Sequence, residues 1–251
     1  IAASIMCKKL ASGADAIVLD VKTGDGAFMK TLDDSFALAK EMVEIGTEMN
    51  RETIAIISDM DEPLGSAVGN SLEVIEAIEA LKGRGPKDFM TLCQTLGAYM
   101  LVSSKIASDY EDGLKRINEA LESGKALEKF KEFVGAQSGC SEIIVLPKAK
   151  MSLEIKAIQD GFIQSIDSRI VGESAVLLGA GREKKSDTID YGAGIILYKK
   201  TGDIVNMGDT IAVLYAESED NLKNAEKLFN ISYIIDEEKP ITKPLIYKTI
   251  K

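Results

Sequence analysis

The chain has 251 residues, of which 45% are hydrophobic and 28% are charged, a composition typical of folded globular proteins. Thirty Lys and Arg residues against forty Asp and Glu give a net charge of −10, which disfavours nucleic acid and anionic membranes as partners. The sequence has no His, and this excludes Ser-His and Cys-His nucleophile pairs and every His-containing metal site.

Three cysteines are present, and they are far apart in the sequence: Cys7, Cys93 and Cys140. This odd number fits neither a disulfide framework nor a zinc cluster, so we expect reduced thiols. There is no apolar stretch of about 18 residues and no signal peptide. The sequence therefore predicts a cytoplasmic, soluble protein.

The first third of the chain alternates helix and strand patterns. Residues 1–12 predict a helix that Gly13 terminates, and residues 16–28 predict a buried strand followed by a Gly-x-Gly turn. Residues 32–49 predict an amphipathic helix, and residues 53–60 a second buried strand. This order is typical of a crossover in a parallel sheet.

A glycine-bearing loop (61–70) comes next, and the Asn70 and Glu73 spacing predicts a capping box at the start of a helix over 71–81. Three more helices are predicted, over 87–107, 110–122 and 124–137.

The pattern changes near residue 150, where short apolar runs separated by Gly and Asp turns predict a small β-rich domain. The same turns are typical of biotinyl and lipoyl carrier domains, but the modifiable lysine hairpin of those carriers is absent. Residues 236–244 predict a charged tail punctuated by proline.

One polar stripe interrupts the first helix, which is otherwise apolar over most of its circumference. Ser4, Lys8 and Ser12 are spaced at i, i+4 and i+8, so they share one side. A hydroxyl and an ammonium projecting from a mostly buried helix can bind a neutral or anionic ligand. The alternative is a partly exposed edge from which Lys8 reaches solvent.

Three further groups allow a functional and a structural interpretation. Gly24-Asp25-Gly26 can approach a phosphate or form an ordinary turn. Asp59, Asp61 and Glu62 can bind a hard cation or form a solvated acidic turn. Arg182, after Gly179-Ala-Gly, can bind an anion or belong to a structural turn.

Three stretches together resemble the pyrimidine-nucleoside phosphorylase family, which includes thymidine phosphorylase: residues 3–30 (ASIMCKKLASGADAIVLDVKTGDGAFMK), 58–78 (SDMDEPLGSAVGNSLEVIEAI) and 178–195 (LGAGREKKSDTIDYGAGI). The similarity keeps the same order and spacing over essentially the whole chain. That family converts a pyrimidine nucleoside and inorganic phosphate into the free base and a pentose 1-phosphate.

The resemblance implies an α/β fold with a central sheet flanked by helices, followed by a small β-rich, barrel-sandwich-like C-terminal domain. Residues 1–13 would be the last helix of the helical domain that binds the pyrimidine. Residues 14–150 would form the α/β domain on the phosphate side, and residues 151–251 the C-terminal domain.

The resemblance also implies site residues. Ser4 and Lys8 match the serine and lysine that contact the pyrimidine, with Lys8 stabilising the charge on the departing base. The carbonyls of Leu64 and Ala67 and the carboxylate of Glu76 match ligands of a potassium ion. The expected partners are a pyrimidine nucleoside, phosphate and a second copy of the chain, as a homodimer.

The family's phosphate loop, a histidine and an arginine near the base match nothing here and would precede Ile1. We therefore expect the 251 residues alone to be inactive and a longer parent to be active. The alternative is a non-catalytic truncated domain with a folding or assembly role only. The anthranilate phosphoribosyltransferases are disfavoured because they lack the β-rich C-terminal domain.

Overall fold

Packing divides the chain into two units, each described here by itself. The first unit comprises Ile1–Met60, Lys87–Ala126 and Lys243–Lys251, and the second comprises Asp61–Pro86 and Leu127–Thr242. The structure is a computed structural model, and it describes residues 1–137, 139, 146–182 and 184–251.

The first unit is built on a three-stranded sheet with the order β1-β2-β10. β1 (Ala16–Thr23) and β2 (Glu52–Asp59) are parallel, and β10 (Ile246–Ile250) is antiparallel to β2. β1 alternates more and less buried residues, whereas central β2 is buried continuously from Thr53 to Ser58. A continuous apolar run fits a strand covered on both faces.

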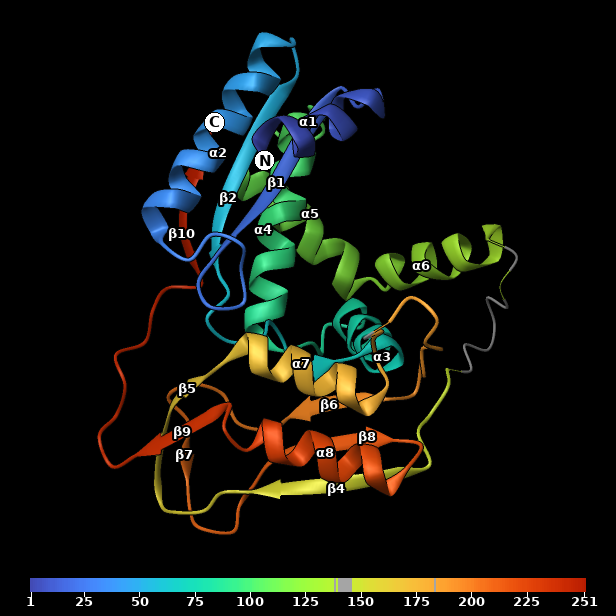
Figure 1. Cartoon of the computed structure of the whole chain (residues 1–251). Helices are drawn as coiled ribbons and strands as arrows, with labels where there is room; N and C mark the ends of the chain where they lie inside the picture. Colours follow the sequence, from blue (N-terminus) through green and yellow to red (C-terminus); the bar gives the residue numbers. More distant parts are fainter. Residues whose placement is uncertain (138, 140–145, 183) are drawn as a thin grey trace. The chain divides into compact units, whose positions relative to one another are not determined.

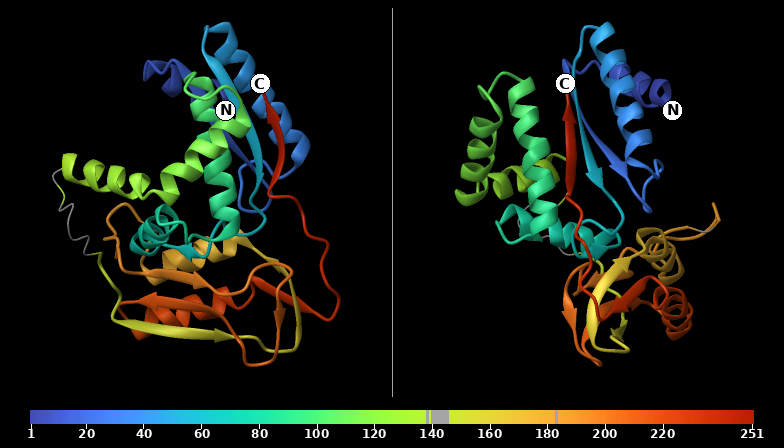
Figure 2. Two further views of the ribbon diagram at one scale, coloured as in Figure 1. Left: turned by 180° about the vertical axis from the view of Figure 1, so that it is seen from behind. Right: turned by 90° about the vertical axis from the view of Figure 1, so that its left-hand side faces the viewer.

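Helices cover both faces of this sheet (Figure 2, right). α2 (Leu32–Glu48) lies on one face and contacts α1 (Ala2–Ala11), whereas α4 (Lys87–Ser103) and α5 (Tyr110–Glu122) lie on the other. Thr31 begins α2 because its hydroxyl accepts the Asp34 N–H at 3.2 Å. The result is a small α/β core in which the crossover helix joins two parallel strands.

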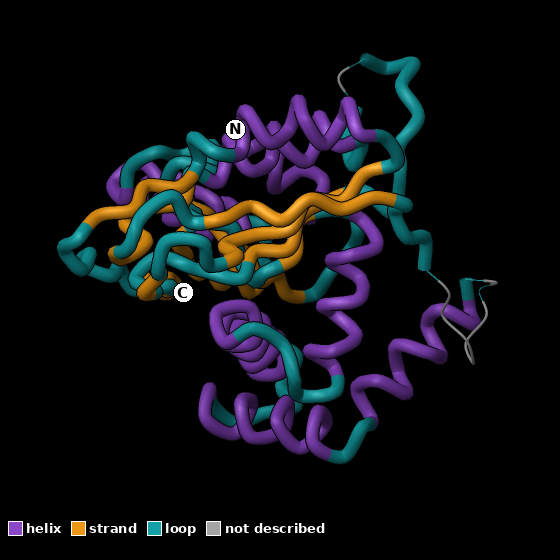
Figure 3. Tube along the Cα trace, turned by 90° about the horizontal axis from the view of Figure 1, so that it is seen from below, coloured by secondary structure: helices purple, strands orange, loops and turns teal. Residues whose placement is uncertain are grey.

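The second unit is rich in antiparallel strands (Figure 1), and strands are coloured orange in Figure 3. One sheet has the order β3-β6-β8-β4 and the other β7-β5-β9. The strands are β3 (Ala67–Val68), β4 (Met151–Lys156), β5 (Gly161–Ile166), β6 (Gly194–Leu197), β7 (Ile204–Val205), β8 (Thr210–Ala216) and β9 (Tyr233–Asp236). The helices are α3 (Asn70–Leu81), α7 (Ser168–Leu178), α8 (Glu219–Phe229) and α6 (Lys125–Ala136), which begins at the boundary of the units.

A large apolar core supports this unit. It joins β5, β6 and β8 to the inner faces of α7 and α8, and Phe229 at the end of α8 is completely buried within it. The rings of Phe229 and Tyr233 lie 5.5 Å apart, a spacing typical of aromatic pairs. Most of the apolar burial that stabilises the second unit is concentrated here.

The predicted fold class is confirmed: a central sheet flanked by helices precedes a β-rich C-terminal part. The packing units cut across the predicted domains, because residues 61–86 pack with the β-rich part and residues 243–251 pack with the first sheet. The domain limits at 13 and 150 therefore stay a prediction.

Three local expectations need correction. First, the N-cap of α3 is Gly69 rather than Asn70. The Glu73 carboxylate accepts the Gly69 N–H, and the side-chain amide of Asn70 instead donates to the Ala180 carbonyl. The helix expected over 87–107 ends at Ser103. After the predicted tail, the chain forms β10, because its apolar residues complete the edge beside β2.

Candidate functional site

Helix α1 presents its polar stripe to solvent. Ser4, Lys8 and Ser12 are all exposed, whereas only Ala2 and Met6 of this helix are buried. The expectation of a mostly buried helix is therefore wrong: Ala2 and Met6 are buried, and the other apolar residues that pack on the core, Ile5 and Leu10, stay partly exposed. Ser4 and Lys8 are still one turn apart on one side, where both can contact a ligand.

Ser12, the third residue of the polar stripe, caps the C-terminal end of α1. Its hydroxyl donates to the Lys9 carbonyl at 2.7 Å, and its backbone closes the helix before Gly13, which has a φ of +78°. Gly13 takes the left-handed conformation that favours glycine after a helix. The candidate binding pair is thus reduced to Ser4 and Lys8.

The Gly-x-Gly segment forms a closed turn at the end of β1. The Gly24 N–H donates to the Met29 carbonyl, and the Gly26 N–H donates to the Met60 carbonyl just after β2. The first bond closes the segment on itself and the second joins it to the carboxyl end of β2, so both support the structural interpretation of the turn.

A polar cluster that the sequence analysis missed lies on β1 and β2. The Ser58 hydroxyl, completely buried, donates to Asp20 at 2.5 Å and accepts from the Lys22 ammonium at 3.0 Å. Lys22 also pairs with Asp20 at 2.7 Å. The signal was present: Asp20 and Lys22 share a strand face, and charges inside an apolar run must be paired.

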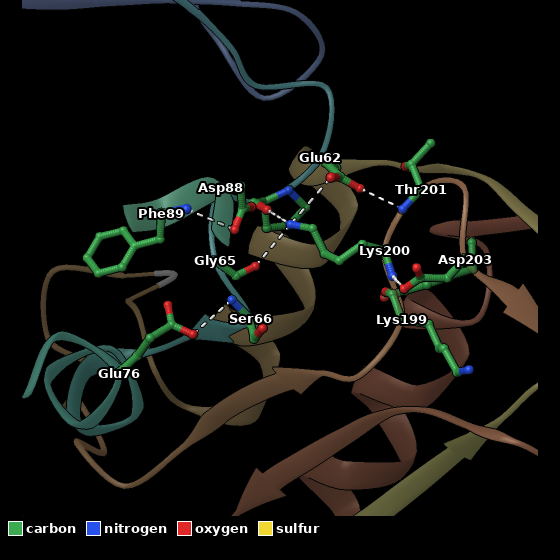
Figure 4. A network of polar contacts seen from close by, with 12 residues as sticks. Glu62, Gly65, Ser66, Glu76, Asp88, Phe89, Lys199, Lys200, Thr201 and Asp203 are labelled. Atoms are coloured by element: carbon green, nitrogen blue, oxygen red, sulfur yellow. Dashed lines mark hydrogen bonds and ion pairs between the residues drawn. The ribbon is translucent and has the colours of Figure 1, made fainter. Parts of the chain in front are cut away.

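Glu76 lies against the loop at residues 61–67, which carries Leu64 and Ala67, the other two residues predicted to bind potassium. The Glu76 carboxylate, on α3, accepts the N–H groups of Ser66 at 2.8 Å and of Ala67 at 3.0 Å (Figure 4). Gly65 has a φ of +71° and lies so close to Glu76 that a Cβ there would meet the carboxylate at 2.2 Å. Glycine is therefore required at this position.

The acidic residues near this loop have protein partners. Asp59 accepts the Tyr247 hydroxyl at 2.8 Å, and Glu62 accepts the Thr201 N–H at 2.9 Å. Within the described part of the chain, Asp, Glu and Cys side chains form no group of three that could hold a metal ion. Direct binding of a cation by the trio Asp59, Asp61 and Glu62 has no support, and a cation here would need backbone carbonyls.

Arg182 closes a surface turn. Its guanidinium donates to the Asp187 carbonyl at 3.0 Å, and the Asp187 carboxylate accepts the Lys184 N–H. This geometry supports the structural interpretation of Arg182.

Two cysteines, Cys7 and Cys93, are free thiols, as expected, and Cys140 lies outside the described residues. Over the residues that the structure describes, no helix is long and apolar enough to cross a membrane.

Comparisons with known proteins agree with this architecture. Residues 2–127 match the family described as "Glycosyl transferase family, a/b domain", and residues 162–236 match "Pyrimidine nucleoside phosphorylase C-terminal domain". The two matches place the chain in the glycosyl transferase class, with homology to nucleoside phosphorylases.

Curated relatives narrow the class. The chain is 50% identical to a pyrimidine-nucleoside phosphorylase of Bacillus subtilis over 87% of its own length and 52% of the relative. It is 48% identical to that of Geobacillus stearothermophilus over 91% of the chain and 54% of the relative. It is 47% identical to that of Staphylococcus epidermidis over 100% of the chain and 58% of the relative. The chain belongs to the pyrimidine-nucleoside phosphorylase family, and it spans a little over half the length of these relatives.

Proposed function

We propose that this chain provides the base-binding and cation-binding residues of a pyrimidine-nucleoside phosphorylase. The reaction converts a pyrimidine nucleoside and inorganic phosphate into the free base and a pentose 1-phosphate. The observation that carries the proposal is the exposed Ser4 and Lys8 pair, one turn apart on α1, in a chain 47–50% identical to proteins of that name.

Lys8 and Ser4 act on the base. When the glycosidic bond breaks, electron density moves onto the departing pyrimidine, and its carbonyl oxygen becomes more negative. The Lys8 ammonium stabilises that charge where it develops, while the Ser4 hydroxyl orients the polar edge of the ring. Both groups need access to a ligand, and both are exposed.

A potassium ion is the second element of the proposal. Carbonyl and carboxylate oxygens are the hard donors that such a cation prefers. The residues fit: Leu64 and Ala67 lie on the loop that Glu76 contacts, and two backbone N–H groups orient the Glu76 carboxylate. The ion would supply positive charge beside the loop, with Leu64, Ala67 and Glu76 as its ligands from this chain.

The C-terminal match favours phosphorolysis over the related phosphoribosyl transfer to anthranilate, because residues 162–236 match the phosphorylase C-terminal domain. Assembly as a homodimer is part of the proposal and is tested by the molar mass in solution.

The test is base release from uridine and thymidine, with and without inorganic phosphate. It is run on the 251 residues and on the complete product of the gene that encodes them. We expect base and pentose 1-phosphate from the complete product, only when phosphate is present, and no turnover by the 251 residues. Release of base without phosphate, or none from either nucleoside by the complete product, would overturn the proposed activity.

A further inference from the structure

The Lys200 ammonium is bound to the same loop that carries the proposed potassium ligands. It donates to the carbonyls of Pro63 and of Gly65, the latter at 3.0 Å, and it lies 3.5 Å from the Glu62 carboxylate (Figure 4). Its side chain is only 23% exposed. Two carbonyls and one carboxylate around a single positive charge are the donor types that a free monovalent cation would take.

The backbone that carries Lys200 is itself fixed. The Asp203 N–H donates to the Lys200 carbonyl, and Gly202 has a φ of +92°, as the third residue of a type II turn requires. The Asp203 carboxylate accepts the Lys200 N–H at 2.7 Å, and backbone bonds between the turn and Ile163 attach it to β5. The ammonium therefore extends from a rigid turn.

A second contact joins the same two segments. The Glu62 carboxylate that faces Lys200 also accepts the Thr201 N–H at 2.9 Å. Glu62 is 26% exposed, so this pair is screened less than a surface ion pair. The turn at residues 200–203 thus holds the loop through a side-chain cation and a backbone donor.

The loop is held from two sides as a result. Lys200 binds the carbonyls that flank Leu64 in sequence, and Glu76 accepts the N–H groups of Ser66 and Ala67. Each peptide unit fixed in this way restricts how its neighbours present their carbonyls, because two dihedrals per residue set the chain path.

We propose that Lys200 is a positioning residue for the cation site: its ammonium acts as a tethered cation that sets the carbonyls of Leu64 and Ala67 for the free ion. The identity of that ion rests on the function proposed above. Lys200 touches neither substrate nor ion and acts through the loop.

The experiment compares the wild type with K200M, with K200R, and with K223M as the matched control. Lys223 forms an exposed ion pair with Glu219 at 2.7 Å in the same unit. Hydrogen exchange of the peptide over residues 61–67 reports the order of the loop, because local opening limits exchange. The cation site is followed by thermal unfolding while KCl replaces NaCl at constant ionic strength. The KCl concentration at which half of the total rise in Tm is reached measures how strongly the site binds potassium.

We expect K200M to exchange about tenfold faster in this peptide and to need about tenfold more KCl, as loss of charged hydrogen bonds predicts. K200R should recover part of both effects, and K223M should match the wild type. If KCl does not stabilise the wild type, the proposed potassium site is wrong. Unchanged exchange in K200M, or faster exchange with an unchanged KCl requirement, would overturn only the role of Lys200.

Discussion

Helix α1 and the loop at residues 61–67 carry the two sets of predicted site residues, and they hold them differently. Ser4 and Lys8 project from an exposed face of a helix that packs on the core through buried Ala2 and Met6 and through partly buried apolar neighbours. The loop has charged partners on both sides, in Lys200 and Glu76. The difference indicates that substitutions on α1 should change binding without changing stability, whereas those around the loop should change both.

The first and largest prediction tests the β-rich core of the second unit, which contains the loop at residues 61–67. Replacing Phe229, which is completely buried, by Ala should lower the free energy of unfolding by about 3–5 kcal/mol because it removes a large apolar side chain. Replacing Phe133, which is 59% exposed on α6, should change it by less than about 0.5 kcal/mol. Denaturant unfolding measures both, and equal effects would contradict the description of this core.

The second prediction concerns α1. K8M should lower kcat/KM of the active protein about 100-fold, since one contact to developing charge is lost, and should leave stability within about 0.5 kcal/mol. K9M is the matched control, because Lys9 is an exposed lysine on the same helix. A comparable loss of activity in K9M, or unfolding of K8M, would show that the pair acts through structure.

The third prediction separates charge from hydrogen bonding at Glu76. E76A removes the acceptor of two backbone N–H groups and should cost about 2 kcal/mol, whereas E76Q keeps an acceptor oxygen and should cost less than about 1 kcal/mol. E76Q should nevertheless abolish stabilisation by KCl. E73Q, changed at the exposed carboxylate that accepts the Gly69 N–H, should keep it. Thermal unfolding in KCl and NaCl decides between them.

The strands and helices of the first unit could be predicted because their patterns are local. The β1 and β2 runs and the amphipathic α2 follow from burial periodicity, and their order predicts the parallel crossover. β10 was missed because its place depends on pairing with β2, nearly two hundred residues earlier in the chain. A pattern read over a few neighbouring residues cannot predict pairing between strands that are far apart in the sequence.

The candidate sites show the same limit. The spacing of Ser4 and Lys8 predicted a shared side, but their exposure depends on which neighbours cover α1. Around the loop, the residue pattern pointed to the acidic side chains, whereas the loop carbonyls are bound by Lys200, which is more than a hundred residues away in the sequence. Every residue has a backbone carbonyl, and all but proline have an N–H, so the residue types do not indicate which of these groups form a site. Such a site can be recognised only once the fold is known.

The smallest predicted effect concerns Tyr233, next to the turn that carries Lys200. Its hydroxyl donates to the Lys199 carbonyl at 2.9 Å, so Y233F should cost about 1 kcal/mol. Burial raises the pKa of Tyr233 above its usual value, and the negative charges of Glu62 and Asp203 act in the same direction. The folded state therefore keeps the phenolic proton more tightly than the unfolded chain does.

A raised folded-state pKa means that the stabilisation is fully present below about pH 10 and is lost as the pH rises above that value. We expect the free energy of unfolding of the wild type to fall faster than that of Y233F above about pH 10, by at most about 1.4 kcal/mol per pH unit. Denaturant unfolding of both proteins from about pH 8 to about pH 11 measures the difference, in which the other titrating groups cancel. Parallel curves would mean that Tyr233 reaches solvent, and the turn at residues 200–203 would then be less firmly held than its contacts indicate.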